Sequence, residues 1–296
     1  MGPAVIAAER LAPDRRLPPP PPLPDLDVAE VDAAALGLSG PRLSFLAAGP
    51  GEGPPVVLLH GIAANATGWR FLLDALAASR FRAIAWNAPG AMLSDPFRAE
   101  TPRPEDYADA LAALMDALGI GRADLVGSSF GTLVAMCFAV RHARRVRRLV
   151  LLGCSRGQRW KTAEERARML AMRAAMAAQG GPAMARERAA ALLGPDPDPA
   201  VLPLLRRMLA ATDGAALLQA ARCSDGADTL DYAPAIAAPA LLLCGEEDRV
   251  NPPEVSCAVA AALPGARLVL LPGIGHLPEL ECPRTTAALV GEHLER

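Results

Sequence analysis

The amino-acid sequence is poor in aromatic residues and in net charge. Of the 296 residues, 4% are aromatic, and the formal net charge at pH 7 is −2. A nearly balanced chain without a dominant basic stripe is not expected to bind nucleic acid. The sequence also lacks a run of 18 consecutive apolar residues, so it predicts no membrane-spanning helix. The expected partner is therefore a small-molecule substrate, and the pattern leaves the oligomeric state open.

The cysteines do not form a recognisable pattern. None of the six has C-x-x-C spacing, and several fall within apolar runs, which argues against a disulfide framework or a zinc site. The N-terminus has no continuous apolar segment of the kind that a secretory signal needs. We therefore expect buried thiols, no metal and a cytoplasmic protein. The cysteines are Cys137, Cys154, Cys223, Cys244, Cys257 and Cys282.

The first 26 residues differ in composition from the rest of the chain. They contain an unbroken proline run from Pro18 to Pro22. Proline cannot donate a backbone hydrogen bond to a sheet, so residues 1–26 are predicted to form a disordered or polyproline-like leader.

After the leader, apolar strands alternate with helical segments. This order predicts an α/β fold with a mostly parallel central sheet and helices on both of its faces. The alternation stops at about residue 154 and resumes at about residue 233. The intervening Ala-, Met-, Arg- and Leu-rich stretch has helical periodicity. We therefore predict a core built from 27–153 and 233–296, with a helical cap formed by 154–232.

A short glycine-bounded motif lies between a predicted strand and a predicted helix. The sequence Gly127-Ser128-Ser129-Phe130-Gly131 follows Ala123–Val126 and precedes a helical stretch. G-x-S-x-G in this context is typical of a strained turn that exposes a serine nucleophile at the edge of a sheet. Ser129 occupies the apex, so it is favoured over its neighbour Ser128.

A serine hydroxyl needs a base, and the base needs an acid to orient it. Asp248 lies four residues after the predicted strand Ala240–Cys244, and His276 lies in a glycine-rich loop after the last predicted strand. The carboxyl ends of parallel strands share one edge of the sheet, where Ser129 is also expected. Glu246 and Glu247 are competing candidates for the acid.

Four motifs in this order resemble those of the α/β-hydrolase superfamily, which includes esterases, lactonases and cofactor-free haloperoxidases. The resemblance covers about residues 42–153 and 236–296 and implies a catalytic triad of Ser129, His276 and Asp248, with no cofactor. The motifs are His60-Gly61, the serine turn, Gly245-x-x-Asp248-x-x-x-Pro252 and Gly273-x-Gly275-His276-x-Pro278-x-x-Glu281-x-Pro283.

The resemblance also implies an oxyanion hole made of two backbone N–H groups. One belongs to Phe130, directly after the nucleophile, and the other to Ile62, just past His60-Gly61. His60 is interpreted as a structural residue that tethers the oxyanion loop.

The cap is expected to shape the substrate pocket. Its methionines, among them Met169 and Met172, adapt to irregular apolar shapes and suggest an apolar acyl or alicyclic group, although they could equally pack the cap helices together. Trp69 and Trp160 are further candidates for the pocket wall. We also considered two arginines near the cap entrance, Arg156 and Arg159, as partners for a substrate carboxylate.

Together these features predict a serine hydrolase that cleaves a carboxylic ester or lactone through an acyl-enzyme. Thioesterase, C–C bond hydrolase, acyltransferase and cofactor-free haloperoxidase activities use the same residues and stay open as alternatives. A small-molecule receptor with slow turnover is the non-enzymatic alternative.

Overall fold

The computed structural model describes residues 8–296 and is built around a nine-stranded sheet. The strand order is β1-β9-β8-β7-β6-β4-β5-β3-β2; β2–β3 and β3–β5 pair antiparallel and the other pairs are parallel. This confirms the predicted α/β fold. The strands are β1 Glu9–Arg10, β2 Leu26–Glu30, β3 Arg42–Ala48, β4 Pro55–Leu59, β5 Arg82–Trp86, β6 Ala123–Ser128, β7 Val146–Leu152, β8 Ala240–Gly245 and β9 Arg267–Leu271.

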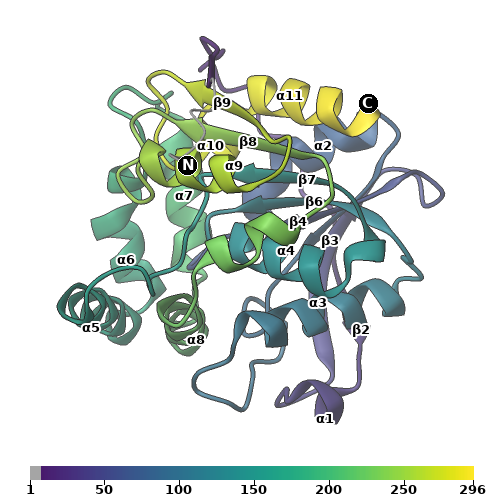
Figure 1. Cartoon of the computed structure of the whole chain (residues 1–296), viewed down its shortest axis with the longest axis vertical. Coiled ribbons are helices and arrows are strands. Elements are labelled where there is room, and N and C mark those ends of the chain that lie inside the picture. Colours follow the sequence, from purple (N-terminus) through teal and green to yellow (C-terminus); the bar gives the residue numbers. More distant parts are fainter. Residues whose placement is uncertain (1–7) are drawn as a thin grey trace.

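Helices cover both faces of the sheet (Figure 1). Successive residues of a strand point to opposite faces, so in β4 Val57 and Leu59 join one apolar cluster while Val56 and Leu58 join the other. Helices α3, α4 and α9 contribute to the first cluster, and α2 and α11 to the second. The helices of the core are α1 Ala33–Leu36, α2 Arg70–Ala78, α3 Pro104–Ala117, α4 Phe130–Arg141, α9 Pro253–Ala262, α10 Pro278–Glu281 and α11 Pro283–Glu295, with short 3₁₀ turns at Ala66–Trp69, Ala143–Arg145 and Ala233–Ala235. A further 3₁₀ turn, Thr229–Asp231, lies at the end of the predicted cap.

Four helices lie in the predicted cap, between β7 and β8. Figure 1 shows them grouped beside the sheet, and their apolar side chains form a third cluster. The first helix begins at Ala163 because the Thr162 hydroxyl accepts the Glu165 N–H while the Glu165 carboxylate accepts the Thr162 N–H. The helices are α5 Ala163–Gln179, α6 Gly181–Arg188, α7 Val201–Ala210 and α8 Gly214–Asp225, and a 3₁₀ turn spans Ala189–Leu192.

The described part of the predicted leader contacts both the sheet and the cap. The Leu11 N–H donates to the Leu270 carbonyl, extending the pairing of β1 with β9, and the Leu17 N–H donates to the Asp198 carboxylate. Residues on the N-terminal side of the proline run supply these donors, so the prolines do not prevent docking. Residues 1–7 of the predicted leader lie outside the described residues.

The remaining predictions from composition concern membrane-spanning helices and the state of the cysteines. Within the described residues, no helix is both long and apolar enough to cross a bilayer. All six cysteines are free thiols, and Cys257 is the one that is exposed rather than buried.

We predict that Gly131→Ala destabilises the fold. Gly131 lies in the first turn of α4, and a Cβ there would stand 2.0 Å from the carbonyl oxygen of Leu59 in β4. The helix and the strand would have to separate, which should lower the free energy of unfolding by about 2 kcal/mol or more. Urea unfolding monitored by circular dichroism measures this change.

Gly291→Ala is the matched control. Gly291 lies in α11, where an added Cβ would meet no atom within 4 Å. This substitution should raise the free energy of unfolding by up to about 1 kcal/mol, because alanine favours the helix. Equal effects of the two substitutions would contradict the close approach of α4 to β4.

Candidate active site

Ser129 lies at the apex of the turn between β6 and α4. Its backbone has φ 52° and ψ −117°, an unfavourable conformation for a residue with a side chain. The flanking glycines permit the turn, because a Cβ on Gly127 would stand 2.6 Å from the Gly131 carbonyl oxygen. Ser129 thereby lines a cavity at the edge of the sheet.

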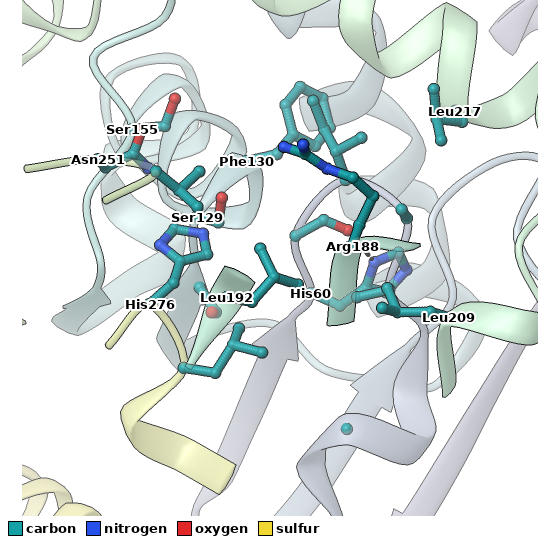
Figure 2. A pocket seen from close by; sticks show the side chains of 18 of the residues that line it. His60, Ser129, Phe130, Ser155, Arg188, Leu192, Leu209, Leu217, Asn251 and His276 are labelled. Carbon is teal, nitrogen blue, oxygen red and sulfur yellow. Dashed lines mark hydrogen bonds between the residues drawn. The ribbon is translucent and has the colours of Figure 1, made fainter. Parts of the chain in front are cut away.

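His276 and Asp248 are brought together by the loops that follow β9 and β8. The distance from His276 Nδ1 to Asp248 Oδ2 is 2.7 Å, and both side chains are buried. Asp248 Oδ1 accepts the N–H groups of Val250 and Asn251 at 2.8 and 2.9 Å, which fixes the carboxylate. With Nδ1 donating to Asp248, Nε2 is free to accept a proton. Figure 2 shows the His276 ring beside Ser129 at the wall of the cavity.

Two of the competing candidates, Glu246 and Ser128, are engaged elsewhere. Glu246 pairs with Arg10 at 2.5 Å, rather than with His276. The Ser128 hydroxyl donates to Glu279 Oε1 at 2.7 Å, and both residues are buried at the cavity wall. Burial raises the pKa of Glu279 above its ordinary value.

The two predicted oxyanion donors line the same cavity as Ser129. Within residues 8–296, neither the Ile62 N–H nor the Phe130 N–H has a hydrogen-bond acceptor. Gly61 allows this loop to approach, since a Cβ there would stand 3.0 Å from Ser129 Cβ. Two unsatisfied N–H groups next to a nucleophile can stabilise a developing oxyanion.

His60 holds the oxyanion loop rather than facing Ser129. The Ala88 N–H donates to His60 Nε2 at 3.0 Å, so Nδ1 carries the proton and donates to the Gly61 carbonyl at 2.8 Å. Burial lowers the pKa of His60 to about 4. The imidazole is therefore neutral at pH 7 and serves as a bridge between two loops.

The cavity has a volume of about 370 Å³ and is enclosed partly by the cap. Three of the four predicted pocket residues, Trp69, Met169 and Met172, line it. Trp160 does not: its side chain is 44% exposed, and its indole N–H donates to the Gly157 carbonyl at 3.1 Å. The indole is held in place by its own loop, away from the cavity. Further cap methionines line the cavity, namely Met176, Met184 and Met208.

Arg156 and Arg159 do not face the cavity either. Arg156 forms an ion pair with Asp228 at 3.0 Å, and Arg159 pairs with Asp231. The cationic residues that line the cavity are instead Arg173, Arg188 and Arg249. The sequence holds a signal for Arg173, because it lies four residues after Met169 and therefore on the same face of a helix.

Glu281 joins the His276 loop to the cap. Its carboxylate accepts the Gly275 N–H at 3.0 Å and the Gly194 N–H of the cap at 2.7 Å. Burial raises the pKa of Glu281 to about 7.

Comparison with known proteins adds a family and several relatives. The model of a family described as "Alpha/beta hydrolase family" matches residues 56–289. Among curated proteins, the chain is 39% identical over 111 residues to a 2-hydroxy-6-oxononadienedioate/2-hydroxy-6-oxononatrienedioate hydrolase of Pseudomonas putida, covering 36% of this chain and 39% of that protein. It is 42% identical over 107 residues to a 2-hydroxymuconate semialdehyde hydrolase of Pseudomonas sp. strain CF600, covering 35% of this chain and 37% of the relative. The chain thus matches less than two-fifths of the length of these relatives.

Solved structures resemble the chain over most of its length. A thermophilic esterase from Thermogutta terrifontis superposes with a TM-score of 0.80 at 27% identity, covering 92% of this chain and 98% of the esterase. An enol-lactonase from Burkholderia xenovorans LB400 superposes with a TM-score of 0.79 at 26% identity, covering 90% of this chain and all of the lactonase.

We predict that His60→Asn changes the pH dependence of stability. In the folded chain the pKa of His60 falls from its ordinary 6.5 to about 4. The stabilisation from neutral His60 is therefore complete above pH 6.5 and lost as the pH falls through 4. The stability deficit of His60→Asn should be largest at pH 7.5 and should shrink by up to about 3 kcal/mol toward pH 4.

Urea unfolding of both proteins at pH 7.5, 5.5 and 4 measures this difference. Gly291→Ala serves as the control, because its stability difference from the parent should not depend on pH. A deficit of His60→Asn that stays constant from pH 7.5 to 4 would contradict a buried neutral histidine.

Proposed function

Because the chain belongs to the alpha/beta hydrolase family, we propose that it is a serine hydrolase that cleaves the bond between a carbonyl carbon and its leaving group. The observation that carries this proposal is the arrangement of Ser129, at the apex of a strained turn, beside His276, whose Nδ1 lies 2.7 Å from Asp248 Oδ2. Ser129 and His276 both line one cavity, which gives a substrate access to them.

Each group then has a role in the proposed reaction. His276 Nε2 takes the hydroxyl proton as Ser129 Oγ attacks the carbonyl carbon, and Asp248 stabilises the resulting imidazolium. The N–H groups of Ile62 and Phe130 stabilise the oxyanion, and donors of this kind contribute about 3–4 kcal/mol each. His276 returns the proton to the leaving group, and water then hydrolyses the acyl-enzyme with His276 again as base.

The first candidate substrate is an oxo acid that is cleaved at a C–C bond. The names of the curated relatives describe hydrolases of 2-hydroxy-6-oxo acids. Such compounds carry a ketone and no ester, so hydrolysing them breaks a C–C bond. Tautomerisation to the 2-oxo form first moves the enol proton to C5, so that the C5–C6 bond can break with C5 departing as a stabilised dienolate. The dienolate then needs a proton, which His276 can deliver. This likeness supports C–C cleavage over the ester cleavage that we expected from the sequence.

Ester or lactone hydrolysis is the second candidate, and a separate observation favours it. The likeness to the esterase and the enol-lactonase covers 92% and 90% of this chain, and therefore includes most of the cap. An enol-lactone also releases an enolate, through oxygen rather than carbon. The same proton transfer from His276 serves both candidates.

We predict that Ser129→Ala abolishes turnover of every substrate that the parent cleaves. Loss of the nucleophile should lower kcat by about 10³-fold or more, because no acyl-enzyme can form. The measurement is hydrolysis of p-nitrophenyl esters from acetate to decanoate, together with labelling by a fluorophosphonate probe. Labelling of Ser129 without turnover would mean that the site is competent and that the cap selects another substrate, whereas neither turnover nor labelling would favour the receptor alternative. Turnover that survives the substitution would overturn the proposal.

We further predict that the parent prefers an oxo acid to a simple ester. For 2-hydroxy-6-oxohepta-2,4-dienoate, kcat/KM should exceed that for p-nitrophenyl butyrate by about tenfold, equivalent to about 1.4 kcal/mol of transition-state binding. Loss of the dienol absorbance measures the first reaction and release of p-nitrophenolate the second. The reverse order would make ester or lactone cleavage the better proposal.

A further inference from the structure

Most of the half-buried arginines of the cap have a carboxylate partner. Arg156 pairs with Asp228, and Arg166 binds Asp225 through two hydrogen bonds of 2.6 and 3.1 Å. Arg173 differs, since within the described residues no carboxylate lies within ion-pair distance of it. Its guanidinium is a partly buried cation without a partner anion.

The surroundings of Arg173 make the absence of a partner anion energetically unfavourable. Arg173 lies on α5, on the face that carries Met169, Met172 and Met176, and all four residues line the cavity that Ser129 and His276 also line. Burial lowers the pKa of Arg173 from its ordinary value, and Asp225, which opposes that shift, is already bound by Arg166. An arginine side chain stays charged at neutral pH even so, and a desolvated charge is stabilised when an opposite charge binds to it.

The rest of the cavity offers Arg173 no ion-pair partner. Among the described residues, the one lining carboxyl belongs to Glu279, which accepts the Ser128 hydroxyl and whose pKa is raised by burial. Two more cations, Arg188 and Arg249, line the cavity and are exposed to solvent. Figure 2 shows the Arg188 side chain reaching from the cap toward Phe130 at the start of α4. The cavity therefore combines an apolar wall with a cationic side.

We propose that Arg173, supported by Arg188, forms a subsite for a carboxylate group of the substrate, at a distance from the carbonyl that Ser129 attacks. A guanidinium presents two parallel N–H donors that match the two oxygens of a carboxylate. The methionines of α5 pack against the apolar chain between the carboxylate and the reacting carbonyl. This subsite rests on the proposed serine-hydrolase function, and it specifies the substrate class as a carboxylic acid whose second carbonyl is cleaved.

The test compares two esters that differ in one terminal group, mono-p-nitrophenyl glutarate and p-nitrophenyl pentanoate. In the parent protein the hemi-ester should be the better substrate by kcat/KM. Arg173→Gln should lower kcat/KM for the hemi-ester by about 10²-fold and change that for the pentanoate by less than about threefold, because only the hemi-ester loses an ion pair. Arg173→Lys should recover part of the loss, since it restores the charge without the two-pronged geometry.

Arg168→Gln is the matched control. Arg168 is an exposed arginine on the same helix and does not line the cavity, so its loss should leave both esters unchanged. An equal effect of Arg173→Gln on the two esters would overturn the subsite while leaving the hydrolase proposal intact.

A binding measurement keeps the subsite testable without turnover. Calorimetric titration of Ser129→Ala with glutarate should detect binding, and Arg173→Gln in the same background should weaken the affinity by about tenfold or more. If the parent cleaves neither ester but glutarate binding depends on Arg173, the result would contradict ester hydrolysis and would still support the subsite. Glutarate binding that does not depend on Arg173 would overturn the subsite.

Discussion

The close packing of α4 against the central strands is the constraint on which the site depends. Ser129 has a positive φ, a conformation that costs on the order of 1–3 kcal/mol for a residue with a side chain. Residues Phe130–Ala139 of α4 are buried, so the helix cannot move away to relax the turn. Phe130 also packs edge-on against Tyr107, with ring centroids 5.0 Å apart. The burial of α4 thereby offsets the strain and fixes both the serine and the N–H group beside it.

The same dependence on packing extends from the core to the cap. The His276 N–H donates to the Leu192 carbonyl at 2.8 Å, and Glu281 accepts N–H groups from Gly275 and Gly194. The loop that carries the candidate base is therefore held on one side by Asp248 and on the other by the cap. A displacement of the cap would change the position of the imidazole as well as the shape of the cavity. In the proposed mechanism, the cap therefore affects both substrate selection and proton transfer.

The parts of the fold and site that could be predicted depend on short stretches of sequence. The turn around Ser129 is specified by two glycines within five residues, and His276 and Asp248 each lie just after a strand, so strand order alone brings them to one edge. The contacts that could not be predicted join distant residues. Arg156 meets Asp228, 72 positions away, and the leader meets Asp198 at Leu17, 181 positions away. No local pattern shows which arginines have partners and which do not.

The core and the cap contribute differently to specificity. In the proposed reaction, the core residues that surround Ser129 perform steps common to any acyl transfer, so they discriminate little between leaving groups. The cap combines flexible methionines, which tolerate many apolar shapes, with a guanidinium that burial has stripped of part of its water. An anionic ligand restores to Arg173 the interactions that folding removed, whereas a neutral ligand of the same shape leaves the charge unpaired. The preference for an anionic over a neutral ligand then arises mainly because the complex with the neutral ligand leaves a desolvated charge unpaired. A preference of this kind is stronger than the one that apolar fit alone provides.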